Sequence, residues 1–247
     1  MSPRPWPLLL LGFCAATAAA EPGPWEQIRD EQGIRVAKRK VDGSPLAEFQ
    51  GRGLVEAPVA RLVAVISDAG RRTEWMAKCV ASQRVARVDE TSEISYNRTQ
   101  GSWPVADRDV VLRGKIVFEP AARRIRLTFD SVTDERMPPQ RGVVRMPFLR
   151  GHWLLEPRGE GQTFVEYQVH ANPGGAIPNW LANLVAKQLP FKTIVALRAQ
   201  AQRASYPEIE ARLAGLPGFP EVMGRRKEAA VLPDAVDGGA PSDGGAR

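Results

Sequence analysis

The middle of the chain is a series of short segments in which apolar and polar residues alternate. Between residues 47 and 55, for example, every odd position is apolar or glycine, whereas positions 48, 50 and 52 are charged or amide residues. A period of two predicts a β-strand with one face turned to water. Turn residues separate successive segments, which predicts an antiparallel meander. The predicted strands are 34–41, 47–55, 81–88, 93–99, 107–118, 124–132, 142–157 and 163–171.

Other segments carry helical patterns. A short helix is predicted over residues 25–31. After Pro58, apolar residues recur at helical spacing and predict a second helix, followed by another short one over 71–79. Residues 177–204 predict one long helix with a bend at Pro190, because proline removes a backbone donor.

The order of these elements predicts an α+β fold. A curved antiparallel sheet has an apolar face that must be covered, and the last helix is the only long amphipathic element available to cover it. We therefore expect a sheet that wraps around a long C-terminal helix, with two short helices after the first strands. The space between sheet and helix is where a ligand would bind.

The two ends of the chain have their own compositions. Arg4, an apolar stretch over 8–13 and the small residues Ala18-Ala19-Ala20 predict a signal peptide over residues 1–20, the alternatives being an uncleaved anchor or a buried helix. Export is therefore expected, to the periplasm if the source is a Gram-negative bacterium and otherwise out of the cell. Residues 215–247 are predicted to form a disordered tail, because the chain becomes rich in Gly, Ala, Pro and Asp. One domain is expected over 21–214.

Composition narrows the classes of partner. The 247 residues are 43% hydrophobic and 25% charged, with a formal net charge of +6. A basic balance favours transient contact with an anionic membrane surface. No basic run is dense or aromatic-rich enough to predict nucleic-acid binding. With Cys14 inside the predicted signal, Cys79 stands alone, so no internal disulfide forms and a monomeric domain held by its core is expected.

The sequence offers little catalytic or metal chemistry. His152 and His170 are the two histidines, and without a third ligand nearby they make a poor zinc site. There is no glycine-rich phosphate loop, Ser–His–Asp arrangement or H-E-x-x-H motif. Cys79 is expected to be a buried, inert thiol. We expect no metal, no cofactor and no enzymatic activity.

Two segments resemble one known family. Residues 103–111 read WPVADRDVV, and residues 173–183 read PGGAIPNWLAN. They are similar to the W-P-x-x-x-R-D stretch and the G-x-x-P-x-W-L-x-N helix entry of the START (steroidogenic-acute-regulatory-related lipid-transfer) family. The resemblance extends over about residues 25–204. It implies a helix-grip fold of the Bet v 1-like superfamily, a hydrophobic tunnel that binds or transfers lipid without a metal or cofactor, and a movable gate between the Trp103 loop and the start of the last helix.

Several residues are candidates for ligand contact. Trp103 lies on a loop, where it either contacts a ligand as a lid or packs on the last helix. Arg108 shares a strand face with apolar residues, so it either meets a polar head group or pairs with a carboxylate such as Glu166. Gln188 lies on the apolar stripe of the last helix and needs a polar partner. The predicted ligand-binding residues are Tyr96, Trp103, Arg108, Val110, Leu112, Ile116, Phe129, Ile177, Trp180, Leu181, Leu184 and Gln188.

Three functions fit this reading. The first is a carrier of a hydrophobic small molecule, such as a lipid or a sterol-like compound. The second is a cyclase- or aromatase-like enzyme on the same fold, which needs a general acid or base in the tunnel. Glu166, Tyr96 and His170 are the candidates for that role. The third is a protein-interaction module that uses the Trp103 loop.

Overall fold

The structure is a computed structural model, and it describes residues 23–101 and 105–224. The predicted signal peptide, Trp103 and residues 225–247 lie outside the described residues.

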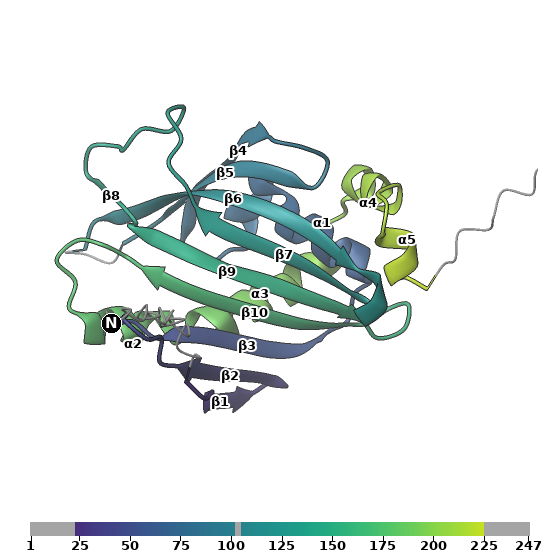
Figure 1. Ribbon diagram of the computed structural model, residues 1–247, viewed down its shortest axis with the longest axis horizontal. Helices are drawn as coiled ribbons and strands as arrows, with labels where there is room; N and C mark the ends of the chain where they lie inside the picture. The colour runs from purple at the N-terminus through teal and green to yellow at the C-terminus, as the bar shows by residue number, and fades with distance from the viewer. Residues whose placement is uncertain (1–22, 102–104, 225–247) are drawn as a thin grey trace, which may run out of the picture.

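One large sheet forms the framework of the described chain (Figure 1). Its strand order is β1-β2-β3-β10-β9-β7-β6-β5-β4, and neighbours in this order are antiparallel. The short strand β8 pairs with β6 in parallel. The strands are β1 (Glu26–Glu31), β2 (Ile34–Arg39), β3 (Glu48–Val55), β4 (Cys79–Arg87), β5 (Ser92–Thr99), β6 (Asp107–Glu119), β7 (Arg124–Ser131), β8 (Val143–Arg145), β9 (Phe148–Pro157) and β10 (Thr163–Asn172).

The predicted helix over 25–31 is wrong, because this segment is the edge strand β1. Gln32 and Gly33 both have positive φ, 53° and 68°, and join β1 directly to β2. Two residues with positive φ form the tight turn that suits the twist of a hairpin. Gly33 therefore belongs to a hairpin turn. In the same way, the predicted strand 142–157 is divided into β8 and β9 around Pro147, which has no backbone N–H to give to a ladder.

The helices lie mainly on one face of the sheet. Helix α1 (Val59–Ser67) follows Pro58 as predicted, and the next short helix is the 3-10 turn η1 (Ala69–Glu74). The predicted last helix is two helices, α2 (Asn179–Ala186) and α3 (Leu189–Arg203). Pro190 lies in the first turn of α3, where its missing N–H leaves no helical hydrogen bond unmade.

Helix α3 packs on the inner face of β2, β3 and β10, which confirms the helix-grip fold. A Cβ atom on Gly51 would lie 2.8 Å from Cβ of Pro190 and 3.0 Å from Cδ1 of Ile194, so glycine is needed at the closest approach. The core below α3 and α1 is fully closed to solvent, with Leu62, Leu155 and Ile194 all at 0% exposure.

The fold continues past the predicted domain boundary at residue 214. Helix α4 (Pro207–Ala214) and the short α5 (Phe219–Val222) follow α3, and Leu213 and Val222 are completely buried. Phe219 meets Phe118 edge-on at a centroid distance of 6.0 Å. The prediction of a disordered tail from residue 215 is therefore wrong for residues 215–224, because apolar residues in this stretch complete the core.

We expect Leu213→Ala to lower the free energy of unfolding by about 2–5 kcal/mol, because it leaves a cavity in the core. Leu184→Ala is the matched control, since Leu184 is 43% exposed and its truncation should cost less than about 0.5 kcal/mol. Urea unfolding followed by tryptophan fluorescence measures both. Equal stabilities of the two variants would show that residues 207–222 are not part of the folded core.

Candidate functional site

A pocket lies on the inner face of the sheet, between β5, β6, β7, β9 and β10 on one side and α1 and η1 on the other. Its cavity volume is about 160 Å³, below the roughly 300–1,000 Å³ of typical ligand sites. A lipid can therefore enter only if the walls move apart. The apolar wall consists of Val110, Leu112, Ile116, Leu127, Phe129 and Trp153.

One side of the pocket is polar. Ser95 and Asn97 of β5 line it, and Arg72 of η1 donates to Ser95 Oγ at 2.9 Å and to Asn97 Oδ1 at 3.2 Å. Burial lowers the pKa of the Arg72 guanidinium, and the nearby carboxylate of Glu93 acts in the opposite direction. That carboxylate is 3.9 Å from Arg72 but 2.8 Å from Arg84, so its shorter ion pair is with Arg84. A buried cation whose carboxylate partner lies at the long limit of an ion pair favours an anionic or strongly dipolar ligand group here.

Tyr96 faces the opposite side of the sheet from the pocket. With Ile94 and Val111 it forms a second small core, against Val132 and Met137 from the loop before β8. Arg145 holds this loop on the sheet, because it donates to Asp109 of β6 at 2.8 and 3.0 Å and to the Met137 carbonyl oxygen at 3.1 Å. Asp109 and Arg108 therefore point to opposite faces. The apolar residues of β5 thus lie under a loop, whereas its polar residues face the pocket.

Arg108 lies in the pocket lining beside Met146 and Leu149. It donates to the carbonyl oxygen of Ala106, and its buried Nε has no partner among the described residues. The pairing with Glu166 is wrong, because Glu166 lies on the other face of the sheet. A ligand group remains the open alternative for Arg108.

Three other predicted residues line a separate groove of about 920 Å³. Trp180 and Leu184 of α2, and Gln188 directly before α3, line this groove together with residues of β1 to β3. Trp180 is 67% exposed. The structure thus brings Arg108, Val110, Leu112, Ile116 and Phe129 together in the pocket, puts Trp180, Leu184 and Gln188 elsewhere, and leaves Ile177 and Leu181 in neither lining.

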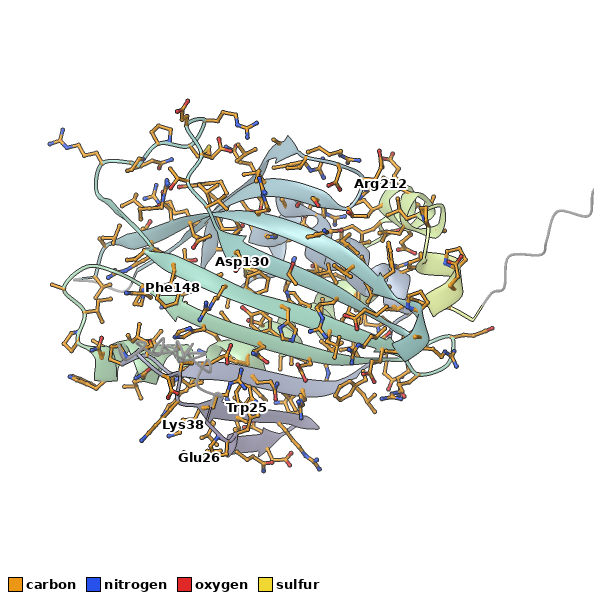
Figure 2. The ribbon with its side chains drawn as sticks, in the orientation of Figure 1. Trp25, Glu26, Lys38, Asp130, Phe148 and Arg212 are labelled. Carbon is orange, nitrogen blue, oxygen red and sulfur yellow. The ribbon has the colours of Figure 1, made fainter. Side chains whose placement is uncertain are left out.

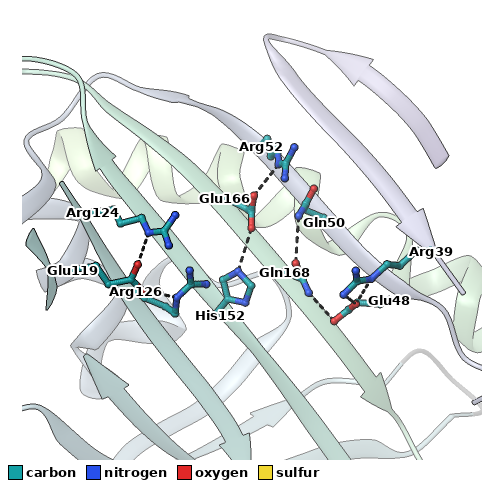
Figure 3. A network of polar contacts seen from close by, with 10 residues as sticks. All are labelled: Arg39, Glu48, Gln50, Arg52, Glu119, Arg124, Arg126, His152, Glu166 and Gln168. Atoms are coloured by element: carbon teal, nitrogen blue, oxygen red, sulfur yellow. Dashed lines mark hydrogen bonds and ion pairs between the residues drawn. The ribbon is translucent and has the colours of Figure 1, made fainter. Parts of the chain in front are cut away.

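The outer face of the sheet carries a ladder of polar contacts (Figure 3). Glu166 accepts from Arg52 Nε at 2.8 Å and lies 3.1 Å from His152 Nε2. Gln168 donates to Glu48 and accepts from Gln50. These long side chains satisfy one another, which explains why Glu48 and Gln50 are buried on the face that the alternation predicted to be wet.

The other titratable candidates, His170 and Cys79, lie in surroundings that indicate structural roles. His170 Nε2 lies 3.2 Å from both Ser44 Oγ and the Leu46 carbonyl oxygen, on the outer face. Burial raises the pKa of the Cys79 thiol, as expected for an inert cysteine. No group of three His, Cys, Asp or Glu residues in the described chain is arranged to hold a metal ion.

Sequence reasoning missed Arg72, Ser95, Asn97 and Arg212, all of which line the pocket. Strand pairing could have found two of them, since Ser95 pairs with Leu112 and Asn97 with Val110, and paired residues share a face. Arg72 and Arg212 reach the pocket from a 3-10 turn and from α4, and no local pattern marks either.

Comparisons with known proteins agree on one family. The family model described as START domain matches residues 14–205. An uncharacterized protein of Pseudomonas aeruginosa is 32% identical over 76% of this chain and 91% of its own length. The crystal structure of a STAR-related lipid transfer protein from Xanthomonas axonopodis, a fragment of residues 25–204, has a TM-score of 0.67 and 36% identity and covers 72% of this chain and 99% of that one. The phosphatidylcholine transfer protein of Rattus norvegicus is 25% identical over 66% of this chain and 77% of its own.

We expect the outer ladder to make stability depend on pH. Burial alone would raise the pKa of Glu166, but the hydrogen bond with His152 and the charge of Arg52 outweigh it, so this pKa lies below its ordinary value. The carboxylate therefore stabilises the fold above the unfolded-state pKa of about 4.3, and this contribution is lost as pH falls through the lower folded pKa.

Glu166→Gln should thus lower the free energy of unfolding at pH 7 and change it little at pH 3. Urea unfolding at both values measures this. Glu156→Gln is the control, because Glu156 pairs with Arg158, whose side chain is 55% exposed. If Glu166→Gln changed the free energy of unfolding equally at both pH values, the pH-dependent stabilisation assigned to the Glu166 carboxylate would be wrong.

Proposed function

The chain belongs to the START domain family, and we propose that it is a carrier that binds a lipid or a similar hydrophobic molecule in the pocket under α1. The observation that carries the proposal is the combination, in one pocket, of an apolar wall and the polar side at Arg72. Such a site suits an amphipathic molecule. Its apolar part would gain about 25 cal/mol for each Å² removed from water.

Ligand entry requires the structure to open, since the pocket is smaller than a lipid. We propose that α2 moves, together with the Trp103 loop, and that they form the gate. Helix α2 is suited to this because none of its residues is buried, so it can separate from the sheet at a low cost in free energy. Asn183 attaches it to the loop before β3, accepting from Ala47 N at 3.0 Å and donating to the Pro45 carbonyl oxygen at 3.3 Å. Gly174 and Gly175, with φ of 65° and 70°, precede it and offer a hinge.

Helix α2 also has the chemistry of a membrane-contact surface. Trp180, Leu184 and Val185 are its exposed apolar residues, and Lys187, Lys38 and Lys40 line the adjoining groove. Figure 2 shows Trp25 and Lys38 at this edge of the molecule, far from Arg212. Apolar side chains beside lysines suit the interface of an anionic membrane. In the described chain, no helix has both the length and the apolar character needed to cross a bilayer.

The pocket is less suitable for a cyclase-like enzyme than for a carrier. Glu166, Tyr96 and His170 do not line it. We therefore propose a carrier without a catalytic step. We further propose that the carrier is exported, on the strength of the signal-like pattern in residues 1–20.

Native mass spectrometry of the purified protein tests the carrier. We expect bound lipid in the wild type, and loss of it in Val110→Trp, because an indole would fill the pocket. Leu54→Trp is the control, since Leu54 is 44% exposed at a position outside the pocket lining. Absence of bound lipid in the wild type, including after incubation with vesicles, would overturn the proposal.

Vesicle experiments test the role of α2. Trp180→Ala should reduce the rate of lipid transfer between anionic vesicles by about tenfold, because roughly 1.4 kcal/mol of apolar burial is lost at the membrane. Val88→Ala is the control, since Val88 is 50% exposed at the far end of β4. Transfer rates that do not differ between the two variants would exclude α2 as the contact surface.

A further inference from the structure

The segment that follows α3 lies beyond the family match, which ends at residue 205. Residues 207–222, which contain α4 and α5 and which we call the C-terminal cap, are nevertheless part of the fold. Glu210 pairs with Arg61 of α1, and Leu213 and Val222 are completely buried. Figure 1 shows α4 and α5 at the opposite end of the sheet from α2.

The C-terminal cap reaches the pocket through Arg212. This side chain lines the pocket and donates from Nη1 to the Glu90 carbonyl oxygen at 2.9 Å. Glu90 lies in the turn between β4 and β5, whose residues 89–92 also line the pocket. The contact therefore joins α4 to the β4–β5 turn at this end of the pocket.

The pocket lining as a whole carries more cationic than anionic side chains: Arg72, Arg87, Arg108, Lys115 and Arg212 against Asp89, Glu90 and Glu93. No carboxylate of the described residues lies within ion-pair distance of Arg212. Burial lowers the pKa of Arg212, and the charge of Arg87 adds to this effect. Of the nearby carboxylates, Asp89 accepts from Thr91 N at 2.7 Å and Glu93 accepts from Arg84 at 2.8 Å. The charges of Glu90 and Glu93 oppose the effect of burial on the pKa of Arg212.

We propose that the C-terminal cap sets ligand selectivity, and that Arg212, with Arg72, binds the phosphate of a lipid head group while the acyl chain lies along the apolar wall. The inference rests on the proposed carrier function and deepens it. Guanidinium groups bind phosphate strongly because their N–H groups match the spacing of its oxygens. The continuity of this charged end with the apolar wall favours a phosphate attached to a lipid over free phosphate.

Two fluorescent lipids with the same labelled acyl chain test the proposal: a phosphatidic acid, which carries phosphate, and a diacylglycerol, which does not. We expect Arg212→Gln to weaken binding of the phosphatidic acid by about tenfold, because a charged hydrogen bond is lost, and that of the diacylglycerol less than about twofold. Arg212→Lys should restore part of the difference. Arg113→Gln is the control, because it removes the same charge from an exposed position on β6.

The outcomes separate the two proposals. Equal losses for both probes, or an effect confined to Arg108→Gln, at a different cation of the lining, would overturn the role of Arg212 and leave the carrier intact. Tight binding of inorganic phosphate by itself would overturn the lipid assignment. A wild type that binds neither probe would overturn both the carrier and this inference.

Discussion

The position of α3 on the sheet determines where a pocket can exist. Pro190 and Ile194 touch the backbone of β3 at Gly51, where a Cβ atom has no room. This close contact holds α3 over β2, β3 and β10, and leaves the inner face of β5, β6 and β7 to α1, η1 and the C-terminal cap. These shorter elements cover that half of the sheet less completely. The pocket therefore lies beside the gripped helix, under elements from both ends of the chain.

The polar side of the pocket reverses the ordinary rule for a half-buried strand. On β5, Ser95 and Asn97 face inward and Ile94 and Tyr96 face outward. The arrangement is stable because both sets have partners: Arg72 satisfies the inward polar groups, and the loop fixed by Asp109 and Arg145 covers the outward apolar ones. An interior guanidinium is costly to desolvate, and the bonds of Arg72 to Ser95 and Asn97 offset part of that cost.

The two ends of the molecule differ in what holds them. The pocket end near α4 is fixed by buried apolar residues and by the ion pair of Arg61 with Glu210. The α2 end has exposed apolar side chains, and the polar bonds of Asn183 attach it to the loop before β3. Elements with few buried contacts open at lower free energy than core elements. A ligand that enters at α2 and is recognised at the C-terminal cap is consistent with this difference.

Local patterns in the sequence determined most of the strands, the helix after Pro58 and the α+β class, because period-two and helical spacing depend only on which face of each element is buried. They also placed Val110, Leu112, Ile116 and Phe129 on a single wall. Local patterns failed at residues 25–31, which form a strand because the following Gln32 and Gly33, with positive φ, make a hairpin turn. They also failed at the predicted boundary at residue 214, because Leu213 and Val222 are buried in a core built by distant segments. Whether Tyr96, Arg72 and Arg212 line the pocket depends on tertiary structure alone. Whether a side chain faces a cavity or a covering loop depends on which elements lie above the sheet, and no residue's neighbours in sequence contain that information.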